Sequence, residues 1–197
     1  STYLAHAWAA RSARAPLAPL QIARRAPTPR DVQIDILYCG ICHSDLHYTH
    51  NDWAPALAAA YPAVPGHEIV GRVSAVGAEV TKHAVGDLVA VGCLVDSDQT
   101  CPICRAGREN FCPNLTLTFG SPDRHGTAPM TFGGYSSSVV VDQHFVLRLP
   151  AKLDPAGAAP LLCAGITTYS PLKRNAVGPG QKVGIVGISG CGKTTLL

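Results

Sequence analysis

Short apolar runs, each bounded by glycine, proline or polar turn residues, fill the first 150 residues of this 197-residue chain and restrict the folds it can adopt. Five runs are rich in β-branched residues or alternate apolar with polar side chains, as β-strands do. They cover residues 32–39, 69–76, 85–91, 139–141 and 145–149. Turn sequences such as Val76-Gly77-Ala78-Glu79 separate them. We therefore expect a compact, mostly β domain over residues 1–150.

The sequence changes character near Lys152. Asp154-Pro155 predicts a helix start, with Asp154 as the N-cap and Pro155 in the first turn, and Ala-rich sequence follows. After Gly178-Pro179-Gly180, residues 183–186 predict a buried strand. We expect a helical connection over residues 151–180 and a second unit that begins at residue 181.

Composition argues against several classes of partner. The chain is 47% hydrophobic and 15% charged, and its net charge of +3 is too small to indicate binding to nucleic acid or an anionic membrane. No apolar run is long enough to span a bilayer. Most of its 8 cysteines are grouped at metal-ligand spacings, which favours a reducing cytoplasm over a secreted disulfide scaffold.

Residues 39–47 place two thiols, two imidazoles, a hydroxyl and a carboxylate where the first predicted strand of the five ends and the chain turns. His67 precedes the next strand, and Cys163 begins an apolar, helical segment. Taken alone, a buried Cys is usually a small hydrophobe. Together, Cys42, His67 and Cys163 offer two thiolates and one imidazole, and three protein ligands with an open fourth position are typical of a catalytic zinc.

Three stretches carry a family resemblance: YCGICHSD at residues 38–45, YPAVPGHEIVG at 61–71 and APLLCAGITTYS at 159–170. With them the chain resembles the zinc-dependent medium-chain alcohol dehydrogenases, in their cinnamyl-alcohol-dehydrogenase-like branch. The resemblance implies a mostly β, GroES-like catalytic domain with flanking helices. It also implies that residues 181–197 form the first strand and turn of a truncated α/β Rossmann domain.

The resemblance implies that the zinc site activates an alcohol for hydride transfer to NAD or NADP. It implies that Ser44 and His47 transfer the proton, that Asp45 supports His67, and that Glu68 is a fourth metal ligand between turnovers. It further implies that His43 contacts the pyrophosphate and Thr167 the nicotinamide of the cofactor. Trp53 and Leu57 either line an apolar pocket for an aromatic or aliphatic alcohol or aldehyde, or serve packing alone.

A second group of ligands consists of Asp98, Cys101, Cys104 and Cys112, and its spacing is the one that the family uses for a structural zinc held by four cysteines. Asp98 stands where the family has the first cysteine. Zinc accepts carboxylate oxygen, although this is a harder donor than sulfur. The alternative is an exposed loop with free thiols and no metal.

The last motif begins at Gly187. As a dinucleotide fingerprint it comprises Gly187, Ile188, Ser189, Gly190, Cys191 and Gly192, with Ser189 at the family's middle glycine. The same stretch matches the phosphate-loop pattern G-x-x-x-x-G-K-T. Because everything upstream resembles a dehydrogenase, we favour a degenerate dinucleotide loop or a sequence junction.

These features predict a zinc-dependent, NAD(P)-linked oxidoreductase that interconverts alcohols and aldehydes and whose full-length form is a homo-oligomer. Too few residues follow Gly180 to build a parallel sheet with its crossover helices. We therefore expect the 197-residue chain to bind zinc without measurable turnover. The alternative is a catalytically inactive zinc-binding fragment of such an enzyme.

Overall fold

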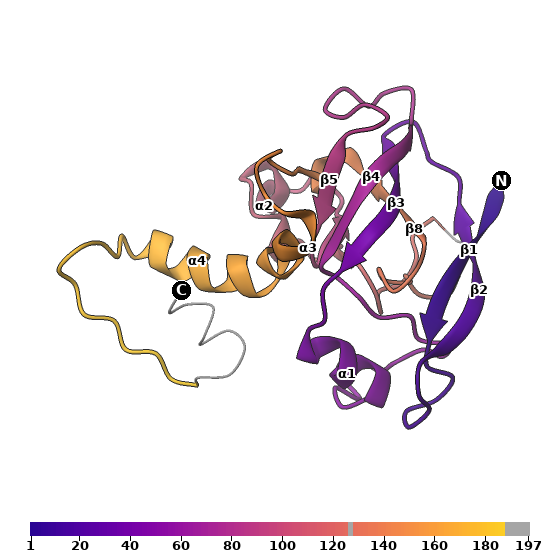
Figure 1. Ribbon diagram of the computed structural model, residues 1–197, viewed down its shortest axis with the longest axis horizontal. Helices are drawn as coiled ribbons and strands as arrows, with labels where there is room; N and C mark the ends of the chain where they lie inside the picture. The colour runs from indigo at the N-terminus through magenta and orange to yellow at the C-terminus, as the bar shows by residue number, and fades with distance from the viewer. Residues whose placement is uncertain (126–127, 188–197) are drawn as a thin grey trace.

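The computed structural model describes residues 1–125 and 128–187 (Figure 1). Its centre is a five-stranded antiparallel sheet with the strand order β8-β3-β4-β5-β9. In chain order these strands are β3 (Asp31–Cys39), β4 (Ile69–Val76), β5 (Leu88–Val91), β8 (Ser138–Asp142) and β9 (Leu147–Arg148). Two smaller antiparallel pairs flank it, β1 (Thr2–Ala9) with β2 (Ala18–Arg25) and β6 (Leu94–Asp96) with β7 (Thr116–Leu117). The predicted mostly β domain is confirmed.

The main core lies within the five-stranded sheet and follows from the alternation in its strands. On β3, Val32 and Ile34 are fully buried, whereas the next residue, Asp35, is exposed. The core side chains that meet from these strands and the following turn are Val32, Ile34, Ile69, Val73, Val89, Val91, Val139, Val141 and Val146. Each such burial removes apolar surface from water and contributes about 1.5–3 kcal/mol.

The sequence predicts no strand over residues 2–9, where the structure has β1 paired with β2. The buried residues on β1 are alanines, which lack the β-branched signature of a strand. Long-range bonds fix the pair: Trp8 donates its amide to the carbonyl of Tyr135 at 2.8 Å, and the Arg24 guanidinium donates to the carbonyls of Phe132 and Gly133. These contacts hold the segment around Tyr135, which reaches the functional site described below.

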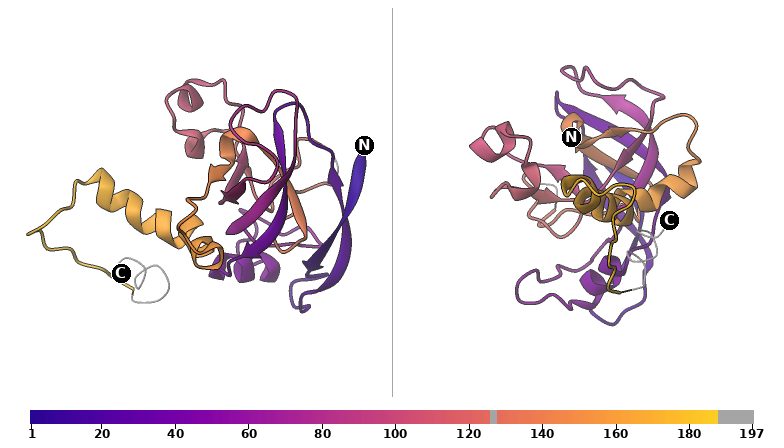
Figure 2. Two further views of the ribbon diagram at one scale, coloured as in Figure 1. Left: turned by 45° about the horizontal axis from the view of Figure 1, so that its top comes forward. Right: turned by 90° about the vertical axis from the view of Figure 1, so that its left-hand side faces the viewer.

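Helices lie at the ends of the sheet and beyond it. They are α1 (His43–His50), α2 (Pro102–Arg105), α3 (Pro155–Ala158) and α4 (Ala164–Arg174), with short 3-10 turns η1 (Glu109–Phe111), η2 (Gln143–Phe145) and η3 (Ala159–Leu162). The predicted cap is present, since the Asp154 carboxylate accepts the amide of Gly157 at 2.7 Å. Helix α4 projects away from the sheet, and residues 175–187 continue past it (Figures 1 and 2).

Three predicted strands differ in the structure. The strand expected from residue 85 begins only at Leu88, because Gly86 turns the chain with a φ of 94°. The strand expected over 145–149 is reduced to β9, since η2 occupies residues 143–145.

The strand expected over 183–186 does not form, and Val186 is fully exposed. A strand needs a neighbour for its backbone groups, and the described residues supply none there. Gly187 has a φ of 89°, whereas Ile188, Ser189, Gly190, Cys191 and Gly192 lie outside the described residues.

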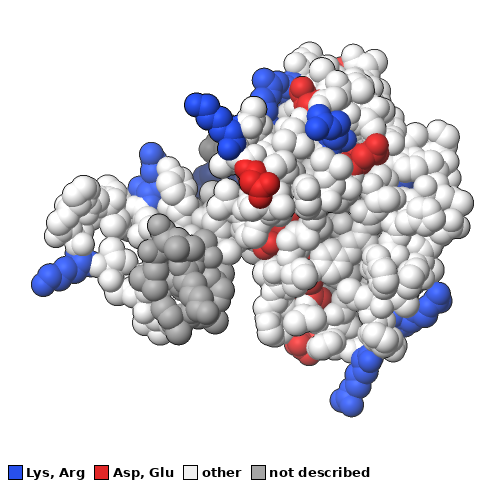
Figure 3. Space-filling model, in the orientation of Figure 1, with Lys and Arg blue, Asp and Glu red and all other residues white. Residues whose placement is uncertain are grey.

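Charged side chains of both signs are scattered over the face of the molecule shown in Figure 3, without a continuous patch among the described residues. None of the helices in the described part of the chain is long and apolar enough to cross a bilayer.

His83, in the turn before β5, is a buried histidine whose ring nitrogens have no hydrogen-bond partner among the described residues. Burial lowers the pKa of His83, and Arg148 and Lys82 add to this effect, whereas the nearby Val146 backbone and Asp87 oppose it. The unfolded chain therefore binds a proton more readily than the folded protein. The stability associated with a neutral His83 is complete above the unfolded pKa of about 6.5 and decreases as the pH falls below it.

We expect His83→Phe to reduce the loss of stability on acidification. Between pH 7 and pH 5.5 the free energy of unfolding should fall less steeply than in the wild type, by up to about 1.4 kcal/mol per pH unit. Urea unfolding of zinc-loaded protein measures this slope. His50→Gln, at an exposed histidine on α1, is the control and should keep the wild-type slope. Parallel pH profiles for His83→Phe and wild type would contradict the prediction.

Candidate metal centre

Asp45, one turn into α1, organises the centre. It is 2% exposed, and both of its oxygens accept hydrogen bonds. One oxygen accepts the backbone amide of Gly66 at 2.8 Å and Nδ1–H of His67 at 3.1 Å. The other accepts the amide of Cys42 at 2.9 Å and the hydroxyl of Tyr135 at 3.3 Å. The carboxylate thus fixes the start of α1 against the segment before β4, and the contact with His67 implied by the family resemblance is present.

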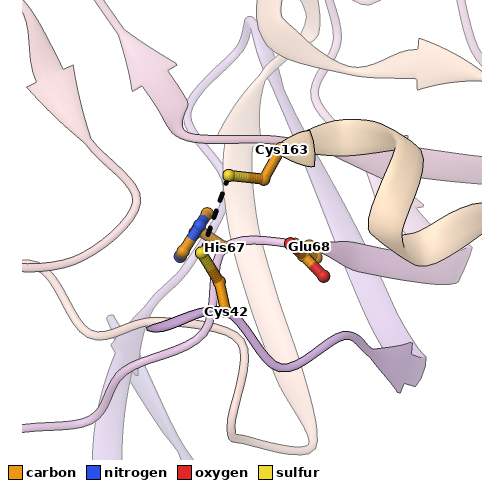
Figure 4. A group of neighbouring side chains, drawn as sticks. All are labelled: Cys42, His67, Glu68 and Cys163. Carbon is orange, nitrogen blue, oxygen red and sulfur yellow. Dashed lines mark hydrogen bonds between the residues drawn. The ribbon is translucent and has the colours of Figure 1, made fainter. Parts of the chain in front are cut away.

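Four possible ligands converge at this point, each placed by the start of an element. Cys42 is the N-cap of α1, His67 and Glu68 directly precede β4, and Cys163 is the N-cap of α4. Their donor atoms all lie within 4.8 Å of one another. Figure 4 shows the sulfur atoms of Cys42 and Cys163 pointing toward each other beside the His67 ring, with Glu68 close by.

The spacing of the two sulfur atoms fits a shared metal ion. Sγ of Cys42 and Sγ of Cys163 are 3.8 Å apart. Two thiolates bound to one tetrahedral zinc at about 2.3 Å would also lie about 3.8 Å apart. Because Asp45 holds Nδ1 of His67, the other ring nitrogen is left for the metal, which is the usual arrangement of a metal-binding histidine.

Glu68 provides a second test of the fit. Its side chain is 3% exposed, and Oε2 has no hydrogen-bond partner in the described structure. Burial raises the pKa of Glu68, and the Asp45 charge adds to this, while His67 lowers it. A Cβ on Gly40 would lie only 1.9 Å from this oxygen, so the absence of a side chain at Gly40 makes room for the carboxylate. A buried carboxylate without a partner is favoured beside a cation.

The pKa values of the cluster also favour a bound metal ion. Burial lowers the pKa of His67, but hydrogen bonds with Asp45 and Cys163 outweigh it and raise the pKa to about 10. The pKa of Cys163 rises to about 12, mainly through its hydrogen bond with Cys93, although His67 lowers it. A divalent ion would take the place of these protons, since it binds thiolates and neutral imidazole.

An apolar cavity of about 150 Å³ opens next to the cluster. Its lining includes Ser44, Trp53, Leu57, Cys93 and Phe119, together with His67 and Cys163. Trp53 and Leu57 therefore line a cavity, as the first of the two sequence interpretations expected. The sequence does not predict Cys93 as a site residue, because it follows β5 outside any ligand spacing. It lies beside Cys163 only because the chain folds back to this point between η3 and α4.

The remaining predicted residues lie on helices α1 and α4. His43 and His47 are on α1 with ring centroids 4.6 Å apart, and Nδ1 of His47 is 2.9 Å from a carboxylate oxygen of Asp52. Thr167 lies on α4 along a separate hollow that shares Cys93 with the cavity. The cofactor contacts of His43 and Thr167 stay predictions.

Asp98, Cys101, Cys104 and Cys112 also converge, with donor atoms within 4.8 Å of one another. Backbone amides point at the sulfurs: Cys104 N lies 3.4 Å from Sγ of Cys101, and Asn114 N lies 3.3 Å from Sγ of Cys112. One Asp98 oxygen accepts the amides of Cys101 and Thr100, at 3.0 Å each, and the other accepts the Asn114 amide group. The Cys101 amide and these neighbours hold the pKa of Asp98 well below its usual range. Asp98 is therefore an ionised carboxylate that hydrogen bonds from its own loop hold in position, and it can act as a metal ligand.

Known proteins are similar to this chain in sequence and in fold. Residues 28–151 match the family described as "Alcohol dehydrogenase GroES-like domain". The chain is 55% identical to the aldehyde reductase YahK of Escherichia coli (strain K12) over 184 residues, which is 92% of this chain and 51% of that protein.

Solved structures agree. A cinnamyl alcohol dehydrogenase of Sorghum bicolor, SbCAD4, superposes with a TM-score of 0.93 at 48% identity, covering 98% of this chain and 54% of that one. A cinnamyl alcohol dehydrogenase from Helicobacter pylori, complexed with NADP(H), gives 0.94 at 41% identity, covering 100% and 56%.

The chain belongs to the alcohol dehydrogenase family with a GroES-like domain, and within it to the cinnamyl-alcohol-dehydrogenase-like branch. It spans about half the length of the curated relatives it matches.

We expect Asp45→Ala to destabilise the protein by at least about 3 kcal/mol, because it leaves several buried donors without an acceptor. Tyr135→Phe, which removes only the hydroxyl 3.3 Å from this carboxylate, should cost about 1 kcal/mol. Urea unfolding of both variants and of the wild type measures the difference. Equal losses in the two variants would show that Asp45 does not hold the site together.

Proposed function

We propose that this chain is the zinc-binding, substrate-binding part of an NADP-linked oxidoreductase that interconverts alcohols and aldehydes. The observation that carries the proposal is the convergence of Cys42, His67, Glu68 and Cys163 at the edge of an apolar cavity. We assign residues 1–150 to the catalytic domain, 151–180 to the helical connection and 181–197 to the start of a nucleotide-binding domain.

Cys42, His67 and Cys163 would hold the catalytic zinc, with Glu68 as an alternate fourth ligand. A zinc ion at this position supplies Lewis acidity, which lowers the pKa of an alcohol or polarises an aldehyde carbonyl. Asp45 orients His67 through Nδ1 and so fixes which ring nitrogen faces the metal.

We assign the handling of the proton to Ser44 and His47. Ser44 lines the cavity beside His67 and Cys163, so its hydroxyl can hold a proton close to a bound substrate. The side chain of His47 is 40% exposed, and the Asp52 carboxylate orients its ring. An exposed imidazole can exchange protons with water near neutral pH. We assign it the outer end of the proton path.

The cavity walls favour an apolar substrate. Trp53, Leu57, Leu117 and Phe119 contribute aromatic and aliphatic surface, and the candidate ligands His67 and Cys163 lie in the same lining. Such a site fits a small aromatic or aliphatic aldehyde with its oxygen directed at the metal. The NADP(H) complex of the Helicobacter pylori relative supports NADP as the cofactor, with His43, Thr167 and residues 187–192 as its expected contacts. A cytoplasmic location and a homo-oligomeric full-length form stay predictions.

We also propose a structural zinc on Asp98, Cys101, Cys104 and Cys112. The amide-to-sulfur contacts described above are those that stabilise thiolates, and the carboxylate is already oriented toward the cluster. The site would tie the loop of α2 and η1 together, because metal binding and local folding are coupled.

For the catalytic site, Cys163→Ala should lose one equivalent of zinc by metal analysis. The control is Cys39→Ala, which removes another partly buried thiol outside the cluster and should keep its zinc. When the chain is joined to the nucleotide-binding half of the Escherichia coli relative, we expect aldehyde-dependent oxidation of NADPH that is lost in Cys42→Ala. Unchanged zinc in Cys163→Ala, or turnover that survives Cys42→Ala, would refute the proposed site.

For the second site, Asp98→Cys should slow the loss of zinc to a chelator, and Asp98→Ala should accelerate it, since a thiolate is the softer and stronger donor for this ion. Release is followed with a colorimetric zinc indicator. Protease resistance of the loop should change in the same order. Wild-type release rates in both variants would show that Asp98 is not a ligand.

A further inference from the structure

The exposed face of α1 carries a pair of imidazoles that the proposed zinc sites do not use as ligands. His43 and His47 are four residues apart on this helix, so they lie one above the other. Their ring centroids are 4.6 Å apart, at an interplanar angle of 64°. His43 is exposed and His47 half-exposed, and both are open to ions from solution.

We propose that His43 and His47 form a third metal site, which binds a borderline divalent ion such as Ni²⁺ or Zn²⁺ at the surface of the protein. Two imidazole nitrogens bound to one ion at about 2.1 Å lie about 3 Å apart when the bonds meet at right angles. Rings with centroids 4.6 Å apart can present nitrogens at that separation. Helical His pairs at this spacing share one face and bind metal in this way.

Asp52 supports the assignment. Its carboxylate oxygen lies 2.9 Å from Nδ1 of His47, which leaves Nε2 of that ring for a metal. A carboxylate behind a ligating histidine fixes the tautomer and makes the imidazole a better donor. His43 has no hydrogen-bond partner among the described residues, so its ring is free to turn toward the ion. Imidazole nitrogen suits zinc, nickel and copper and does not suit magnesium or calcium.

The site differs from the two cysteine clusters in chemistry and in access. Those clusters offer thiolates in partly or fully buried positions, whereas this one offers nitrogen alone at the surface. Its affinity is expected to be lower and its exchange faster. An ion bound here would take the lone pair of His47 that the proton path needs, so excess metal would inhibit the enzyme. That consequence rests on the proposed function, but the binding itself does not.

Trp53 makes the site measurable. Its ring centroid lies 5.7 Å from that of His47, close enough for a bound Ni²⁺ to quench its fluorescence. The experiment uses zinc-loaded protein in a Trp8→Phe background, so that the cysteine clusters are filled and Trp53 is the remaining tryptophan. Ni²⁺ is titrated and the half-quenching concentration recorded. Added Zn²⁺ should restore the fluorescence by displacing Ni²⁺.

His43→Gln and His47→Gln should each raise the half-quenching concentration at least tenfold. His144→Gln is the matched control: the His144 side chain is 38% exposed and paired with Glu109 at 2.8 Å, but has no second imidazole beside it. That variant should stay within twofold of wild type.

Saturable quenching that survives either His43→Gln or His47→Gln, or quenching that His144→Gln reduces equally, would overturn the two-histidine site. Circular dichroism of each variant shows whether it remains folded. Because fluorescence requires neither NADPH nor turnover, failure of the proposed enzyme activity would leave this result unchanged, and failure of the quenching would leave the activity test unchanged.

Discussion

The buried carboxylate of Asp45 is the interaction on which the functional centre depends. A carboxylate removed from water is stable only when its lone pairs are occupied, and here four donors from three separate segments occupy them. Because all four donors must reach this one carboxylate, each of them is held in position. The helix N-terminus, the turn at Gly66, the His67 ring and the Tyr135 hydroxyl cannot move independently. The positions of two of the candidate metal ligands, Cys42 and His67, therefore follow from the hydrogen bonds of one buried carboxylate.

That arrangement concentrates negative charge. Asp45, Glu68 and the thiols of Cys42 and Cys163 surround a single imidazole, and the hydrogen bonds with Asp45 and Cys163 outweigh burial and raise the pKa of His67 to about 10. A proton at one ring nitrogen compensates only part of this charge, and Oε2 of Glu68 is left without a partner. A divalent cation satisfies the thiolates, the imidazole and the carboxylate together. The electrostatics of the protein and the 3.8 Å sulfur separation thus favour the same occupant.

The sequence predicted the parts of this centre that depend on local pattern. Strands β3 and β4 and the cap at Asp154 follow from alternation and cap chemistry, and the ligand residues follow from motif and family resemblance. Cys93 and the β1 strand did not follow, because an isolated thiol has no local signal and the buried positions of β1 are alanines rather than β-branched residues. Only contacts across the fold give them a place. The strand expected over 183–186 shows the converse: an apolar run predicts a strand, but pairing decides whether it forms.

Helix α1 would separate the two proposed kinds of metal site on opposite sides of one short element. Its buried side carries Asp45, and its N-cap supplies Cys42, a soft sulfur donor of the proposed catalytic site. Its solvent side carries His43 and His47, whose ring nitrogens can stay in contact with water when no ion is bound. The helical period separates the two sets, since residues four apart share a face and those two apart do not. A permanent site and an exchangeable one can therefore coexist within a few residues, because burial, rather than sequence distance, decides which ion each retains.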